Sequence, residues 1–388
     1  MKGTSDELEG HSTLSTKLRK RLYADSVVNG GRQAELDMAK FVAICCLALV
    51  HCTIECTPES GLVSGIPYLF DTIIGGPLSA PLFMFTMGIG MVYTKNNSTK
   101  AYAGRGLKLI VIGYLLNICR FLIPFLIGYA LTGNYDKYIL PLPYLVAEND
   151  VLLFAGLAMI VLSLFVRLRL SDAAILCIAL GMSIAGTCLN GTDAGTPAGN
   201  ILLGYLIGTE DHAGMVRSYF PLMNWMIVPA SGYIFGKRLR RVKSKKLFYG
   251  LLSPVCILIT IAYFWFGISN ELGMFGEGQN CYYHITTPDI AASLCAACGL
   301  LGIYHVIIRY VPSKMMHIVQ AVSRNINAVY CIHWVLVSMI INVFIYAVRG
   351  TQELPIAITM VLGTGIGLGA MGIAHLWRKW TFRKGGCT

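Results

Sequence analysis

One histidine near the end of a long apolar segment is the first candidate for chemistry in this sequence. His51 lies in the segment LALVHCTIE, and Glu55 follows it by four residues. On a continuous helix these two side chains share one face. An imidazole titrates near neutral pH and suits a general base, and a neighbouring carboxylate could orient it and stabilise its cation. The simpler alternative is a histidine that only hydrogen-bonds to a neighbouring membrane helix.

Arg120 and His333 are polar side chains in the interior of apolar segments. Arg120 lies in NICRFLIP and cannot lose its charge, so it needs a polar cavity, an anion or a buried ion-pair partner. His333 lies in VYCIHWVL, and Tyr330 precedes it by three residues, so the two could form one polar strip. A hydrogen bond between helices is the simpler role for a lone intramembrane histidine. We treat Arg120 as a candidate donor-binding residue, and Tyr330 and His333 as candidate cavity residues.

Five further residues complete the polar candidates. Asn149 and Asp150 open one apolar segment, Asn224 lies inside another, Asp71 precedes a third, and His284 lies in a loop. None of them forms a metal-ligand spacing, a Gly-rich phosphate loop or a nucleophile elbow. The sequence therefore predicts neither a metal site nor ATPase chemistry.

A charged stretch, RQAELDMAK, opens the segment that ends in His51. Its carboxylates, Asp37 among them, suit a helix N-terminus, whose dipole favours negative charge. Arg32, Asp37 and Lys40 are also candidate donor-binding residues, because the cationic mouth that they belong to could attract the phosphates of a nucleotide-like donor. Other basic residues next to apolar segments add to this charge: Lys95, Lys100, Arg105 and Lys237–Lys246. The same residues could act only as determinants of membrane topology.

The composition shows which elements must position these residues. The chain has 388 residues, of which 55% are hydrophobic and 13% charged, with a mean hydropathy of +0.62. A soluble domain carries about 25% charged residues. The net charge of +11 lies between apolar runs, without a basic face interleaved with aromatics, which argues against nucleic-acid binding. These features predict an all-α integral membrane protein in a lipid bilayer.

About ten apolar runs are long enough to be transmembrane helices. They are 37–56, 74–94, 107–131, 150–166, 172–189, 218–236, 247–267, 289–309, 318–347 and 355–376. If residues 1–35 form a cytoplasmic tail, the basic connections all fall on the cytoplasmic side. Both termini are then cytoplasmic, with a membrane domain over 36–377 and a basic tail over 378–388.

Several segments resemble the transmembrane acyltransferase superfamily. The pattern Arg32-x-x-Glu35-Leu36-Asp37-x-x-Lys40, ending in His51, resembles the first helix of that superfamily. Two segments resemble its heparan-α-glucosaminide N-acetyltransferase-like branch, which is related to the acyltransferase 3 family. The further matching segments are PLSAPLFMFTMGIGMVY (77–93), NDVLLFAGLAMIVLSLF (149–165), YFPLMNWMIVPASGYIFGK (219–237) and NINAVYCIHWVL (325–336), and the second and third of these carry the resemblance to the branch.

The resemblance implies an enzyme that uses cytoplasmic acyl-CoA, acetyl-CoA among the possible donors, and an acceptor on the far side of the membrane. It implies His51 as the catalytic base, acting on a hydroxyl or amine of a sugar, glycan or small polar molecule. Lys40 stands where the family commonly has Arg, and a lysine ammonium lacks the planar fork with which a guanidinium binds an anion in bidentate geometry. Residues 52–71 contain no histidine, unlike the heparan enzyme, so His284 could supply a second base.

Two other functions stay open at this stage. A transporter or exporter would use Arg120 and His333 along its pathway, but the Gly and Pro breaks at 75–77 and 229–232 are not arranged as paired half-helices. A non-catalytic sensor could use the same bundle. We also predict a multi-pass protein of a bacterial plasma membrane, with a homodimer as a possible assembly.

Overall fold

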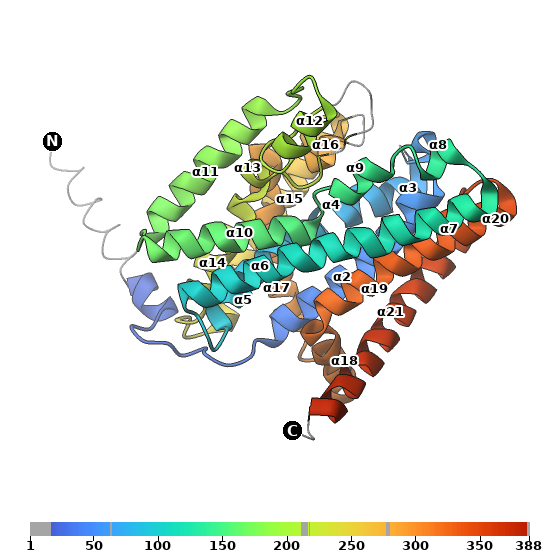
Figure 1. Cartoon of the computed structure of the whole chain (residues 1–388). Helices are drawn as coiled ribbons and strands as arrows, with labels where there is room; N and C mark the ends of the chain where they lie inside the picture. The colour runs from blue at the N-terminus through green and yellow to red at the C-terminus, as the bar shows by residue number, and fades with distance from the viewer. Residues whose placement is uncertain (1–16, 63, 211–215, 217, 277–279, 386–388) are drawn as a thin grey trace.

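The computed structural model describes residues 17–62, 64–210, 216, 218–276 and 280–385. Within these residues the regular elements are helices, without a β-strand, and eight helices are long and apolar enough to cross a membrane (Figure 1). The prediction of an all-α integral membrane protein is therefore confirmed. The count of ten spans and the cytoplasmic placement of both termini stay predictions.

The eight long spans are made of single helices or of helices joined end to end. They are α2 (Ala34–Cys56), α6 (Thr99–Asn117) with η3 (Ile118–Leu122) and α7 (Ile123–Thr132), α8 (Tyr135–Tyr138) and α9 (Leu142–Ala147) with α10 (Val151–Arg167), α11 (Asp172–Leu189), α15 (Lys245–Ser269), α17 (Thr287–Ile307), α19 (Ile326–Val337) with η5 (Ser338–Ile345) and α20 (Tyr346–Arg349), and α21 (Ile356–Gly385).

The two other predicted spans are interrupted helices. The run 74–94 divides at Ser79 into α4 (Gly75–Leu78) and α5 (Ala80–Tyr93), and the run 218–236 contains α13 (Leu222–Trp225) and α14 (Ile227–Leu239). Prolines in the first turns of α5 and α14 donate no backbone hydrogen bond, which favours a fresh helix start at each position.

The interrupted helices α5 and α14 pack directly against each other. A Cβ atom added to Gly88 would lie 2.1 Å from the carbonyl oxygen of Pro229, and one added to Gly232 would lie 2.2 Å from that of Phe85. Only glycine permits such a close approach of two helix backbones. The sequence did not predict this pairing, because the two segments are more than 130 residues apart.

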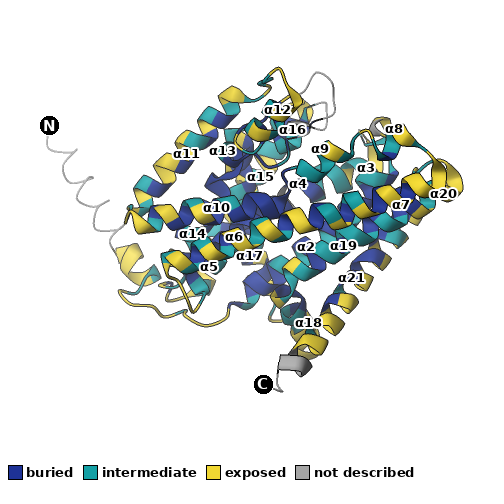
Figure 2. Ribbon diagram, viewed as in Figure 1, coloured by how far each residue is buried: buried dark blue, intermediate teal, exposed yellow. Residues whose placement is uncertain are grey.

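Burial separates the central helices from the rim. In the most apolar window of α10, 72% of the residues are buried, against 22% in α11 and in α15, and Figure 2 shows the same contrast. A helix with an apolar but exposed surface suits contact with lipid. The helices α2, α10 and α17 therefore form the interior of the bundle, while α11, α15 and α21 cover its outside.

Short elements fill the connections between the spans. They are η1 (Glu59–Gly61), α3 (Gly65–Tyr68), η2 (Leu69–Ile74), α12 (Pro197–Gly204), η4 (Gly273–Phe275), α16 (Asn280–Tyr283) and α18 (Ser313–Arg324). The helix α18 is amphipathic. It lies at the end of the bundle where α2 begins, as shown by the hydrogen bond that the Arg32 side chain donates to the carbonyl oxygen of Gln320.

We call this end of the bundle the basic end, because it carries the cluster Lys237–Lys246. Arg378 near the end of α21 donates to Asn325 here. The described part of the N-terminal tail is ordered here too, since Tyr23 bridges to Val242. Residues 1–16 of the predicted cytoplasmic tail lie outside the described residues.

Candidate functional site

A cavity of about 1040 Å³ lies at the end of the bundle opposite the basic end. It is lined by residues of α2, α5, η3, α9 and α19 and by the connections around η1, η4 and α16. Many of its lining residues have ionisable or aromatic side chains: His51, Glu55, Asp71, Arg120, Glu148, Asp150, Tyr219, Tyr282, Tyr283, Tyr330 and Trp334. Six of the sequence-predicted site residues therefore share one cavity.

His51 is held at the cavity wall by two residues of α19. Its Nδ1 atom lies 2.9 Å from Nε2 of His333. The indole of Trp334 stacks on the His51 ring, with centroids 4.0 Å apart and an interplanar angle of 24°. These contacts fix both the position and the tilt of the imidazole, because one nitrogen and one face are occupied.

The surroundings of His333 indicate which nitrogen of His51 is basic. Nδ1 of His333 is buried and has no hydrogen-bond partner among the described residues, and the backbone groups of Val329 and Tyr330 lie close to this ring. Carbonyl oxygens only accept, so we place a proton on this nitrogen, and Nε2 of His333 is then an acceptor. In this assignment, Nδ1 of His51 donates to that nitrogen. The lone pair of His51 therefore resides on Nε2, in a ring that lines the cavity.

Arg120 lies beside this pair and is almost fully buried, with 2% of its side chain exposed. Its guanidinium contacts Glu148 at 3.2 Å and Asp150 at 3.5 Å, and it lies 4.8 Å from the ring centroid of Trp334. Two carboxylates thus surround one buried cation, which satisfies the requirement that a charge inside a membrane be paired. One cation and two carboxylates leave a net negative charge, so the Arg120 ion-pair group is a poor site for a further anion.

A π-helical turn brings Arg120 to the cavity. η3 spans Ile118–Leu122, and the carbonyl oxygen of Arg120 accepts from the hydroxyl of Ser338 on η5. Such turns release a backbone group from the regular ladder and are frequent at functional sites. The turn explains why an arginine in an apolar run reaches an acidic partner rather than lipid.

A chain of hydrogen bonds joins Arg120 and His51. The Tyr330 hydroxyl donates to Oδ1 of Asp150 at 2.7 Å, and the Trp334 indole N–H donates to the Tyr330 oxygen at 2.9 Å. Trp334 in turn stacks on His51. Because each link occupies a donor or an aromatic face, the base and the ion pair hold one another in a defined geometry.

Glu55 and Asp71 line the same cavity at some remove from the histidine pair. The Gln352 amide lies 3.5 Å from Oε2 of Glu55, and Lys137 is held near this carboxylate. Burial raises the pKa of Asp71 to about 6. We expected Glu55 to orient His51 by its spacing of four residues, but the hydrogen-bond partner of Nδ1 is His333, 282 residues further along.

Asn149, Asn224 and His284 lie outside the lining of this cavity, as His333 does. Asn149 donates to the carbonyl oxygen of Phe220, and Asn224 donates to that of Ile285. The Nε2 atom of His284 lies 3.1 Å from the carbonyl oxygen of Ser218, and burial lowers the pKa of this histidine. These contacts join loops to helices, so the position of His284 favours a structural role over that of a second base.

The predicted donor-binding residues other than Arg120 lie at the basic end, away from His51. Asp37 forms an ion pair with Arg32 at 2.5 Å and accepts from Ser323 at 2.6 Å. Lys40 is one turn further along α2, and its ammonium has no hydrogen-bond or ion-pair partner among the described residues. Lys95 follows α5 and is exposed, and Arg105 is half-buried on α6.

Sequence reasoning missed Glu148 and Trp334, which complete the site. Each is a direct neighbour of a predicted residue, Asn149 and His333 respectively. The sequence signal that could have identified them is their position next to a polar residue in or at the start of a span. Within the described residues, no group of three or more His, Cys, Asp or Glu side chains is arranged to hold a metal ion.

The comparisons with known proteins concern the whole membrane bundle. A family model described as an acyltransferase domain matches residues 33–374. The matched range begins one residue after Arg32 and includes every residue of the histidine pair and of the Arg120 ion-pair group. A search of curated proteins finds no match.

Proposed function

Because the chain belongs to the acyltransferase 3 family, we propose that it transfers an acyl group, such as acetyl, from acyl-CoA to an acceptor bound in the cavity. The acceptor would be a sugar, a glycan or a small polar molecule with a free hydroxyl or amine. The observation that carries the proposal is the His51 ring, which His333 and Trp334 hold at the cavity wall.

The chemistry follows from the position of that nitrogen. Nε2 of His51 takes the proton of the acceptor hydroxyl or amine while the acceptor atom attacks the thioester carbonyl carbon. The carbon–sulfur bond then breaks, and the CoA thiolate receives the proton back from His51. His333 keeps Nδ1 of His51 as a donor throughout. A transient acyl-histidine would begin from the same nitrogen.

The walls of the cavity support a polyhydroxylated or amine-bearing acceptor. Carboxylates accept hydrogen bonds from hydroxyl and amine groups, and Glu55, Asp71 and Glu148 all line the cavity. Tyr282 and Tyr283 add broad apolar faces with polar tips. We propose that the cavity faces away from the cytoplasm, in accord with the positive-inside rule.

The donor would enter from the basic end. Lys40 carries an unpaired cation on the same helix as His51, eleven residues earlier, which corresponds to about 16 Å along the axis. Its nearest acidic neighbour, Asp37, is already bound by Arg32 and Ser323. An unpaired ammonium at this depth favours a negatively charged ligand.

The test is transfer from radiolabelled acetyl-CoA to a panel of sugars and amines by the purified protein. We expect His51→Ala to lower the rate about 10²–10⁴-fold, as loss of a general base does. His317→Ala is the matched control, because His317 is exposed on α18 and distant from the cavity. Equal transfer by His51→Ala and the control would remove His51 from the mechanism.

A transporter is the second candidate function. The pairing of the interrupted helices α5 and α14 favours it, since transporters bind substrates where broken helices meet. Uptake of an acceptor into proteoliposomes without acetyl-CoA, combined with no acyl transfer by the wild type, would support this alternative. The closer relation to the heparan-α-glucosaminide branch, the bacterial plasma membrane and the homodimer stay predictions.

A further inference from the structure

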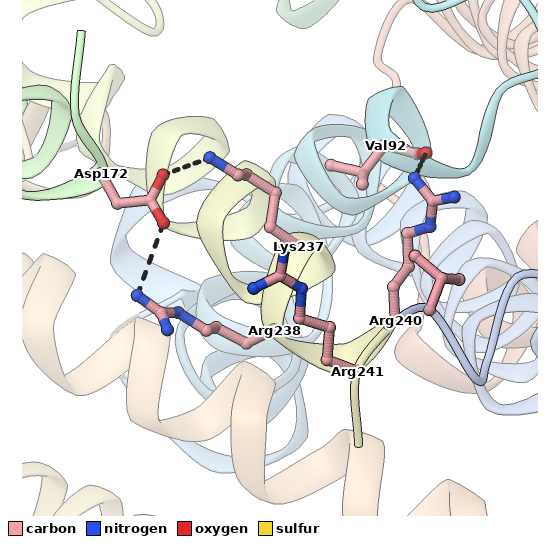
Figure 3. Close-up of a pocket in the computed structure, with 7 residues that line it drawn as sticks. Val92, Asp172, Lys237, Arg238, Arg240 and Arg241 are labelled. Atoms are coloured by element: carbon pink, nitrogen blue, oxygen red, sulfur yellow. Dashed lines mark hydrogen bonds and ion pairs between the residues drawn. The ribbon is translucent and has the colours of Figure 1, made fainter. Parts of the chain in front are cut away.

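A second cavity of about 290 Å³ lies at the basic end of the bundle (Figure 3). It shares no lining residue with the His51 cavity. The helix α5 runs between the two cavities, with Phe83 at one and Val92 at the other, a rise of about 14 Å. The lining residues are Val27, Val92, Asp172, Lys237, Arg238, Arg240 and Arg241.

This basic-end cavity has a large excess of positive charge. Asp172 is its one acidic lining residue, and it is shared by Lys237 and Arg238, the latter at 3.5 Å. The side chain of Arg241 has no hydrogen bond or ion pair among the described residues, as Figure 3 illustrates. Four cations therefore face one carboxylate, which leaves three positive charges without a counterion.

Arg240 has a donor that the protein leaves unused. Its Nη1 donates to the carbonyl oxygen of Val92 at 3.4 Å, but its Nε is buried and has no partner. A buried donor without an acceptor costs about 1–3 kcal/mol. Cations near the C-terminus of α14 complement the helix dipole, but that effect does not account for the unpaired Nε.

The backbone of the cavity is fixed before any ligand arrives. The backbone N–H groups of Val28 and Asn29 donate to the carbonyl oxygen of Arg240 at 2.9 and 3.0 Å. The backbone N–H of Ala24 donates to the carbonyl oxygen of Arg241 at 2.8 Å. The N-terminal segment thus holds both arginines in place. A preorganised site loses less entropy when it binds a ligand.

We propose that the basic-end cavity binds a phosphate group. Planar guanidinium groups match tetrahedral phosphate oxygens, and a phosphate would supply both an acceptor for Nε of Arg240 and the missing negative charge. The cavity lies at the ends of membrane helices, where basic pockets bind anionic headgroups. The phosphate could belong to a phospholipid headgroup or to a soluble nucleotide such as CoA, and only the second source rests on the proposed function.

The test measures stabilisation of the full-length protein in nanodiscs by a thermal shift. One arm titrates CoA and inorganic phosphate in neutral phosphatidylcholine, and the other replaces part of that lipid with phosphatidylglycerol. Binding raises the unfolding midpoint with ligand concentration. A rise with CoA or phosphate assigns a soluble phosphate, and a rise only with phosphatidylglycerol assigns the lipid headgroup. No rise in either arm would overturn the proposal.

The variants show whether the arginines carry the effect. We expect Arg240→Gln with Arg241→Gln to need about tenfold more ligand for the same shift. Arg241→Gln alone guards against misfolding, because its side chain supports nothing in the fold. Lys314→Gln with Lys379→Gln removes equal charge from exposed positions outside the Lys237–Lys246 cluster and should leave the shift unchanged. An equal loss in both double variants would contradict the proposal, whereas His51→Ala should bind like the wild type even if the acyltransferase assignment fails.

Discussion

At the level of single residues, the proposed role of His51 as a base depends on two neighbouring side chains. In the tautomer assigned above, His333 accepts the hydrogen bond from Nδ1 of His51, and Trp334 covers one face of the ring. His333 does not line the cavity, so in this account it is a positioning residue that sets the tautomer of His51. This assignment leads to a prediction that a purely structural role would not produce.

Replacing His333 separates positioning from packing. In His333→Gln the amide oxygen can still accept from His51, and we expect activity within about tenfold of the wild type. His333→Phe fills a similar volume but offers no acceptor, so kcat should fall about 10- to 100-fold with KM unchanged. Steady-state kinetics on both variants provide the measurement. If glutamine and phenylalanine were equally impaired, or if only KM rose, His333 would not position the base.

The sequence identified His51, Arg120 and Asp150 as site residues but not their contacts. The spacing of four residues suggested Glu55 as the partner of His51, because this spacing identifies only neighbours on the same helix. The partner His333 comes from α19, and the partners of Arg120 come from the start of α10 and the end of α9. Such contacts depend on how helices pack, which the spacing within one segment does not encode.

At the scale of elements, the pairing of α5 and α14 is the most demanding contact. Both helices begin at an interruption, and their backbones approach each other at Gly88 and Gly232. The N-terminal part of α5 lines the His51 cavity, and the C-terminal part reaches the basic-end cavity. A change in this contact would therefore disturb both cavities together.

We predict that Gly88→Ala destabilises the protein by about 1–3 kcal/mol, because the added Cβ meets the backbone of Pro229 rather than a side chain that can move. Gly104→Ala on α6 is the control, since a Cβ there meets nothing within 4 Å and alanine favours a helix. The unfolding midpoint of each variant in the same detergent gives the comparison. A Gly88→Ala protein as stable as Gly104→Ala would contradict the packing.

The apolar runs predicted every long helix, because hydrophobic length alone decides which segments fit a bilayer. The interruptions near Ser79 and Trp225 were not predicted as helix boundaries. A proline that starts a new helix and a proline inside a continuous span look alike in a sequence. Packing against the neighbouring helix determines whether the helix is interrupted or continuous there.

At the scale of the whole molecule, the two ends of the bundle differ in charge and in chemistry. The basic end carries the Lys237–Lys246 cluster and the ordered N-terminal segment, whereas the opposite end opens into the His51 cavity. If the basic end is cytoplasmic, as the positive-inside rule predicts, the proposed donor and acceptor enter from opposite sides of the membrane. The pattern of charge predicted this polarity, but it could not predict that two separate cavities would exist.

Sided transfer in proteoliposomes tests this arrangement most directly. Acetyl-CoA is supplied only on the side that exposes the Lys237–Lys246 cluster, as established by protease access, and the acceptor is supplied only on the other side. We predict acetylated acceptor on the far side with wild-type protein and about 10²–10⁴-fold less with His51→Ala. Product formed only when both substrates share one side, or formed equally well by His51→Ala, would contradict the account.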